Sequence, residues 1–271
     1  MRMKGRHIAI VAPILAGLGV GPALADELLP HRAVYDLSLY ERTERSGITA
    51  ISGRMVYEFN GSACDGYTVT FRFVTRIDTD EVSRLTDQQT TTFEEGSGDS
   101  FTFVTRSFID QSLQKELKGT ARLSPSATLV SLEKPANEEM TLEETQFPTQ
   151  HLLELLQKAQ QGETFYETSL FDGSEDGDKV MTTTVIIGKQ TSPRPNDAEA
   201  SRIPALGDDR YWPVDMAYFD LSTGNEIPTY RISFKLHDNG ITRDLVMDYG
   251  DFSMTGRLVE LATFDAPEDC D

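Results

Sequence analysis

The sequence predicts an all-β protein: one long antiparallel sheet, curled or closed on itself, together with one substantial α-helix. Most of the chain after residue 25 alternates apolar and polar side chains, which is typical of antiparallel strands covered on one face. A single segment changes to a helical period. The strand candidates number roughly ten to fourteen, and a sheet of that size must curl or close to manage its edges.

The first 25 residues have the layout of a secretory signal peptide. A basic start without acids precedes an apolar run at 8–20, and Ala23 and Ala25 follow in an A-x-A arrangement. We expect cleavage after Ala25 and a mature chain in the periplasm. A membrane anchor is the alternative, but the run is shorter than the about 20 residues that span a bilayer and contains Pro13.

The mature chain is expected to be a single domain over residues 26–271, which is 271 − 25 = 246 residues. The signal segment holds three of the 25 Lys and Arg residues and none of the 44 Asp and Glu residues, so the mature net charge is 22 − 44 = −22. Such a surface repels phosphate backbones and anionic headgroups. Nucleic acid is therefore excluded as an expected partner.

The strand candidates run almost the full length of the mature chain. Residues 67–78 alternate most strictly, with Tyr67, Val69 and Phe71 on one side and threonine or arginine on the other. Other strand candidates before the helix are 33–40, 53–59, 99–110, 115–124 and 127–135. After the helix, strands are expected at 164–172, 179–190, 210–220 and 228–261, which are rich in aromatic and β-branched residues.

Two connecting segments have turn signals. Asp238-Asn239-Gly240 separates two alternating runs and predicts a hairpin. Residues 191–210 hold three prolines and are expected to form a loop.

Residues 147–163, FPTQHLLELLQKAQQGE, form the predicted helix. Thr149 is the expected N-cap residue and Gly162 the C-cap glycine. The apolar side chains at helical spacing are Leu152, Leu153, Leu156 and Ala159. Because the helix is single and amphipathic, it should lay its leucine face against or inside the sheet.

Cys64 and Cys270 are the only cysteines. An even cysteine count in an exported chain favours a structural disulfide, which would hold a polar C-terminal tail. Closing a loop of about 200 residues stabilises by up to about 5 kcal/mol. A redox or catalytic thiol is the alternative, but there is no C-x-x-C, and the neighbouring Asp65 and Asp269 disfavour a thiolate.

Several of these segments together resemble the EipB family of alphaproteobacterial cell-envelope integrity proteins. The segments that carry the resemblance are AVYDLSL, FPTQHLLELLQKAQQGE, LFDGSEDGDKV, YWPVDMAYFD and SFKLHDNGITRDLVMDYGDFSMTGRLVEL. They cover nearly all of the mature chain, and none of them is a catalytic signature.

The resemblance implies a periplasmic, monomeric β-spiral, in which the sheet curls as an open barrel around the helix. It also implies that a disulfide joins an early turn to the C-terminus, which falls on Cys64 and Cys270 in this sequence. Finally, it implies a role in envelope homeostasis and stress survival, and a functional interaction with a periplasmic tetratricopeptide-repeat protein.

The sequence predicts no catalytic residue, cofactor or resident metal. His31, His151 and His237 lie in three separate contexts, without the spacing of zinc ligands. His151 is expected to be solvated or at the edge of the core. G-x-S-x-G and Gly-rich phosphate loops are absent from the sequence.

Residues 172–183 contain an incomplete calcium-loop pattern. Side chains that place oxygens at alternate positions are Asp172, Ser174, Asp176 and Asp178. Gly177 occupies the position of the sharp turn, but Thr183 stands where a bidentate Glu is needed. The segment is therefore interpreted as an acidic solvated turn.

Trp212 is the only tryptophan, and Pro213 follows it. Core packing at the start of a strand is the expected role. The alternative is an aromatic anchor at the mouth of the curled sheet, where such folds hold apolar ligands.

These observations predict a non-enzymatic periplasmic binding or scaffold protein without a membrane span, acting through a protein partner or an apolar envelope ligand. One alternative is a lipid or lipoprotein carrier, which needs an apolar cavity. A second is a hydrolase of envelope polymers, which needs carboxylates or a nucleophile converging in one cleft.

Overall fold

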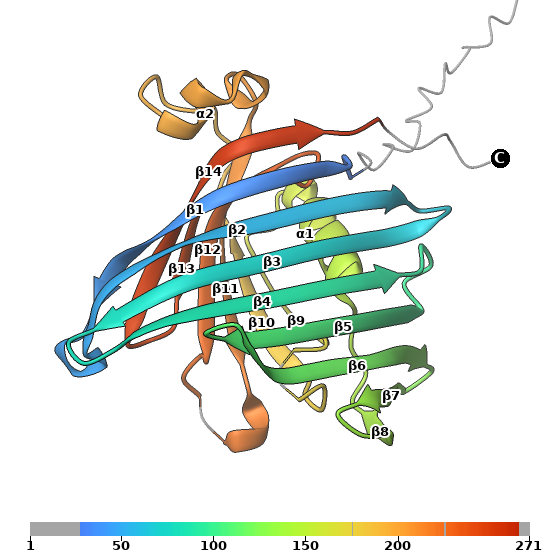
Figure 1. The fold of residues 1–271 in the computed structure, drawn as a ribbon. Helices are drawn as coiled ribbons and strands as arrows, with labels where there is room; N and C mark the ends of the chain where they lie inside the picture. The colour runs from blue at the N-terminus through green and yellow to red at the C-terminus, as the bar shows by residue number, and fades with distance from the viewer. Residues whose placement is uncertain (1–27, 175, 225, 266–271) are drawn as a thin grey trace, which may run out of the picture.

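A computed structural model of the chain describes residues 28–265, apart from 175 and 225 (Figure 1). Its fourteen described strands form one antiparallel sheet in the order β8-β7-β6-β5-β4-β3-β2-β1-β14-β13-β12-β11-β10-β9. The predicted all-β class and long curled sheet are confirmed. The sheet is not closed, because β8 and β9 remain its two edges. The signal-peptide prediction for 1–25 lies outside the described residues.

The elements follow one another as hairpins, with one helical crossover. Before the crossover lie β1 (His31–Arg42), β2 (Ile48–Ser62), β3 (Gly66–Thr79), β4 (Ser83–Glu94), β5 (Ser100–Ile109), β6 (Ser112–Ser124), β7 (Ala127–Lys134) and β8 (Glu138–Leu142). Next come α1 (Pro148–Gln161), β9 (Phe165–Leu170), β10 (Met181–Ile187), α2 (Ala198–Arg202), β11 (Tyr211–Phe219), β12 (Tyr230–His237), β13 (Thr242–Asp248) and β14 (Phe252–Thr263).

The first and last strands meet in the middle of the sheet, where β1 pairs with both β2 and β14. Leu37 lies opposite Gly53 on one side and Gly256 on the other. A Cβ atom added at Gly53 would lie 2.2 Å from the carbonyl oxygen of Val74. Only glycine allows such a close approach, which is typical of a tight bend in a strand.

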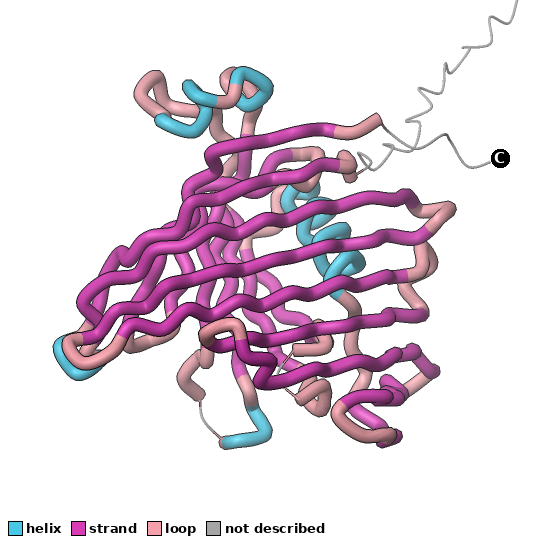
Figure 2. Tube along the Cα trace, viewed as in Figure 1, coloured by secondary structure: helices cyan, strands magenta, loops and turns pink. Residues whose placement is uncertain are grey.

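Helix α1 lies inside the curl of the sheet (Figures 1 and 2). Phe147 is its N-cap residue and Pro148 its first residue, so the expected N-cap at Thr149 is wrong. Pro148 needs no partner because it has no N–H. The Glu94 carboxylate, at the end of β4, accepts hydrogen bonds from the Thr149 and Gln150 amides at 2.8 and 2.9 Å.

The predicted C-cap glycine is confirmed, since Gly162 has φ of 79° and donates to the Ala159 carbonyl. The segment entering α1 also covers part of the β9 edge. Gln146 donates its backbone N–H to the Ser169 carbonyl and accepts from the Phe171 amide. This short parallel pairing satisfies backbone groups that an open edge would leave exposed.

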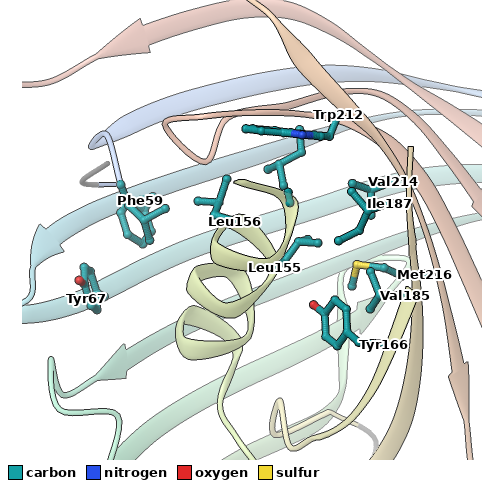
Figure 3. Close-up of a cluster of buried hydrophobic side chains, with 13 residues drawn as sticks. Phe59, Tyr67, Leu155, Leu156, Tyr166, Val185, Ile187, Trp212, Val214 and Met216 are labelled. Atoms are coloured by element: carbon teal, nitrogen blue, oxygen red, sulfur yellow. The ribbon is translucent and has the colours of Figure 1, made fainter. Parts of the chain in front are cut away.

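Apolar side chains fill the space between α1 and the sheet. Leu155 and Leu156 of α1 pack against Trp212, Val214 and neighbouring residues (Figure 3). A second cluster joins β1, β2 and β12–β14, and a third gathers Phe101, Phe103, Phe147 and Phe171. Trp212 is 6 % exposed within the first cluster, which agrees with its expected core role.

Of the two turn and loop predictions for the second half of the chain, one is confirmed and the other is only partly correct. The hairpin predicted at Asp238-Asn239-Gly240 is confirmed, and Gly240 has φ of 84°. The predicted loop at 191–210 instead contains α2 and a 3-10 turn at Pro204–Leu206. The buried side chains of Ile203 and Leu206 join the second cluster and hold this segment on the sheet.

Candidate functional site

A pocket of 430 Å³ lies between the 191–210 segment and strands β11 to β14. It is located on the face of the sheet opposite α1. Trp212 and Leu236 pair across β11 and β12 and pack with α1, whereas their neighbours Tyr211 and His237 pair with each other one residue along. Because successive side chains of a strand point to opposite faces, Tyr211 and His237 face the pocket side.

Asp197 ties the 191–210 segment to the sheet. Its carboxylate caps α2 by accepting from the Ala200 amide at 3.0 Å. It also accepts from Arg243 Nη1 at 2.9 and 3.0 Å, and from Lys235 Nζ at 2.8 Å. Desolvation would raise the pKa of Asp197, but the bonds from Lys235, Ala200 and Arg243 outweigh it and hold this pKa well below its usual value.

Arg243 is fully buried at the centre of this network. Its Nε–H donates to His237 Nε2 at 2.9 Å, so the neutral His237 ring carries its proton on Nδ1. Burial, followed by the charge of Arg243, lowers the pKa of His237 to about 4. His237 Nδ1 lies 3.1 Å from Asp209 Oδ2, although the direction is not that of a hydrogen bond.

Glu199 is the second buried carboxylate, with 3 % exposure. Its Oε1 accepts from the Leu258 amide of β14 at 2.6 Å, and its Oε2 lies 3.6 Å from Arg243 Nη1. Glu199 Oε2 has no hydrogen-bond partner within the described part of the chain. Burial raises the pKa of Glu199, and the bond from Leu258 only partly offsets this.

The aromatic ring of Tyr211 packs against the cationic groups of Lys235 and Arg243. Lys235 Nζ and Arg243 Cζ each lie 5.0 Å from the centre of its ring. Cations at this distance are attracted to the negative face of an aromatic ring. The Tyr211 ring therefore helps to hold the Lys235 and Arg243 side chains in place.

A β-bulge shapes one side of the pocket. The register between β12 and β13 shifts after Ser233, which pairs with Val246, so that Lys235 pairs with Arg243. Asp244 lies in the shifted stretch, with a left-handed φ of 54°. Its carboxylate forms an ion pair with Lys235, with 2.9 Å between Lys235 Nζ and Asp244 Oδ2. Bulges of this kind redirect side chains, and backbone strain of this kind gathers at functional sites.

The arrangement is better suited to binding than to proton transfer. Both oxygens of Asp197 already accept hydrogen bonds from Arg243 and from a second donor. They leave little lone-pair capacity to activate a water molecule. Glu199 is engaged by the backbone of β14. The fixed charges instead form a rigid, polar wall.

The calcium candidates have other roles in the described structure. The Asp172 side chain accepts from the Ser174 amide at 2.8 Å, and Asp176 forms an ion pair with Lys115 at 2.6 Å. Asp178 takes part in no cluster, because residues 28–265, apart from 175 and 225, contain no group of three His, Cys, Asp or Glu that could hold a metal.

The three histidines lie in different places. His31, in β1, donates from Nδ1 to the Leu29 carbonyl, His151 is buried on α1, and His237 belongs to the pocket network. The expected solvated or edge position of His151 is wrong, because the curled sheet surrounds α1 and leaves this side chain 5 % exposed.

The predicted cysteine pair is only partly within the structure. Cys64 lies in the turn between β2 and β3, where its amide approaches the Ser62 hydroxyl. Cys270 lies outside the described residues, so the Cys64–Cys270 bond stays a prediction.

Comparisons with known proteins agree along almost the whole chain. Residues 22–265 match the family model described as EipB-like. The chain is 54 % identical over 245 residues to the cell envelope integrity protein EipB of Brucella abortus, covering 90 % of this chain and 87 % of that protein. A crystal structure of a beta-barrel-like protein of unknown function from Brucella abortus has a TM-score of 0.85 and 54 % identity, covering 89 % of this chain and all of the other.

Within the described part of the chain, no helix is both long enough and apolar enough to cross a membrane.

Proposed function

Because the chain belongs to the EipB-like family, we propose that it is a non-enzymatic binding protein that maintains cell-envelope integrity from the periplasm. The observation that carries this proposal is the 54 % identity over 245 residues with a protein named for envelope integrity. The proposal includes export with cleavage after Ala25, and action as a monomer through a protein partner or an envelope ligand. A periplasmic tetratricopeptide-repeat protein is the partner implied by the family resemblance.

The pocket supports a binding role. Its acids Asp197 and Asp244 are both paired with Lys235, so the charges are fixed before any ligand arrives. Preorganised groups of this kind favour recognition, because little conformational entropy is lost on binding.

A hydrolase of envelope polymers is a second candidate, because Glu199 and Asp197 line the same pocket. The pKa of Glu199 is raised and that of Asp197 is lowered, which is the pattern of an acid and a base. The hydrogen bonds that occupy Asp197 weigh against this role. Purified protein should therefore release no products from peptidoglycan or lipid, and clear turnover would overturn the binding proposal.

A lipid carrier requires an open interior, and here α1 occupies that position. Both ends of α1 are fixed, by Glu94 at its start and by the Gly162 cap at its end. Loading a lipid would require these contacts to break. The binding proposal therefore places recognition outside the curl.

Deletion of the gene in its native host tests the envelope role. The deletion strain should lose resistance to detergent and to cell-wall antibiotics, and the full chain should restore it. A chain that lacks residues 1–25 and remains in the cytoplasm should not restore it, at equal protein level. Normal growth of the deletion strain under all of these stresses would refute the envelope role, and N-terminal sequencing of the periplasmic protein should begin at Asp26.

A further inference from the structure

Two arginine side chains at the pocket have no polar partner within the described part of the chain. Arg194, from the segment before α2, and Arg257, from β14, both line the pocket and are exposed. Neither guanidinium group forms a hydrogen bond or an ion pair with any described residue. Asp36 lies opposite Arg257 across β1 and β14, but its carboxylate pairs with Arg54.

The acceptors that line the pocket are not paired with these donors in the structure. Asp197 is occupied by Arg243 and Lys235, and Asp244 is paired with Lys235. The pocket is lined by three cations, Arg194, Lys235 and Arg257, and by three acids, Asp197, Glu199 and Asp244. The lining charges therefore balance, 3 − 3 = 0, in contrast with the net charge of −19 of the whole chain.

We propose that this pocket binds a small organic ligand through a carboxylate group held by the guanidinium groups of Arg194 and Arg257. A guanidinium group presents parallel N–H donors that match the two oxygens of a carboxylate. The remaining polar wall, including Asn196 and the exposed carboxylate of Asp244, offers hydrogen bonds to amide groups of the same ligand. The terminal carboxylate of a short peptide has this chemistry.

Charge and shape favour a monoanion over a polyanion. One carboxylate is enough to pair with the two unpaired guanidinium groups, and the strongly acidic chain repels additional negative charge. Lys235 and Arg243 lie over the Tyr211 ring, and Tyr211 is only 6 % exposed, so little aromatic surface is open for a base to stack on. A volume of 430 Å³ is in the range of small-molecule sites.

Calorimetric titration of the purified full chain tests this inference. The probes are N-acetyl-dialanine with a free carboxylate, its C-terminal amide, and inorganic phosphate. The free acid should bind at least about tenfold more tightly than the amide, because the amide keeps the shape and lacks the charge. The Arg194→Ala/Arg257→Ala variant should lose the same factor, with an unchanged melting temperature because both side chains are exposed.

The matched control is Arg84→Ala/Arg122→Ala, which removes two exposed arginines from β4 and β6 and changes the net charge equally. This variant should bind the free acid as the unaltered chain does. The inference is overturned if the free acid does not bind at millimolar concentration, if acid and amide bind alike, or if phosphate binds more tightly. Equal loss in the control variant would also overturn it. The titration does not depend on the deletion phenotype, so this inference and the envelope role can fail separately.

Discussion

Substitution of Glu94 by alanine should destabilise the protein through the buried start of α1. Glu94 is 1 % exposed, and its two carboxylate oxygens accept from the Thr149 and Gln150 amides. These amides belong to the first turn of a helix, where no intrahelical carbonyl is available. The side chain of the N-cap residue, Phe147, has no acceptor to replace the carboxylate.

The size of the effect follows from two opposing contributions. A buried donor left without an acceptor costs about 1–3 kcal/mol, so two amides give about 2–6 kcal/mol. The desolvation cost of the carboxylate disappears with the side chain, and the raised pKa of Glu94, due first to burial, shows that this cost is substantial. We therefore expect a loss of about 2–4 kcal/mol in the free energy of unfolding, or roughly 4–16 °C in melting temperature.

Urea unfolding followed by circular dichroism measures this loss, and Glu95→Ala is the matched control. Glu95 is the next residue and its side chain is exposed, so its removal should change stability by no more than about 0.5 kcal/mol. If Glu94→Ala and Glu95→Ala unfold at the same urea concentration, Glu94 does not cap α1 and the reasoning is wrong.

Two further predictions concern protonation and the cysteines. Burial lowers the pKa of His151 from 6.5 to about 4, so the unfolded chain takes up a proton in this window that the native chain does not. The free energy of unfolding should fall as the pH drops through that window, and His151 should contribute up to about 3 kcal/mol of this loss. The His151→Leu variant should lose less stability over the same window than the unaltered chain. If the variant and the unaltered chain lose stability equally, the prediction is wrong. Cys64→Ser, Cys270→Ser and the double variant should lower the melting temperature equally, and additive losses would show that the cysteines are not partners.

The His151→Leu variant must be compared with the unaltered chain because buried acids change the pH dependence of stability in the opposite direction. Burial raises the pKa of Glu94 and of Glu199, so the native chain holds protons above the usual glutamate value. Stability from these groups falls as the pH rises through their raised pKa values. The total pH profile is a sum, and only the variant isolates the histidine.

Much of the fold could be predicted because alternation records which strand face is buried. Residues 67–78 alternate strictly and form most of β3. β4 was not predicted, since its sequence SRLTDQQTTTFE is polar on both faces. It becomes a strand because β3 and β5 pair with it on both sides. Tertiary pairing decides such segments, and local sequence does not.

The site could not be predicted because its parts are far apart in sequence and look ordinary in isolation. Lys235 and His237 alternate with Leu236, which is also the pattern of a solvated strand face. The 191–210 segment, read as a loop from its three prolines, covers this face through Asp197 and Glu199. The burial of Arg243 therefore depends both on the bulge at Asp244 and on the 191–210 segment that covers it. No local sequence pattern predicts the bulge or the position of that segment.

The two faces of β11 and β12 separate the core from the pocket. Trp212 and Leu236 support α1, whereas Tyr211 and His237, one position away, contribute to the charged network. Side chains on the pocket face can therefore change without disturbing the contacts that hold the helix inside the curl. A binding specificity located there can vary within one fold, whereas a ligand carried inside the curl would compete with α1 for the same apolar surface.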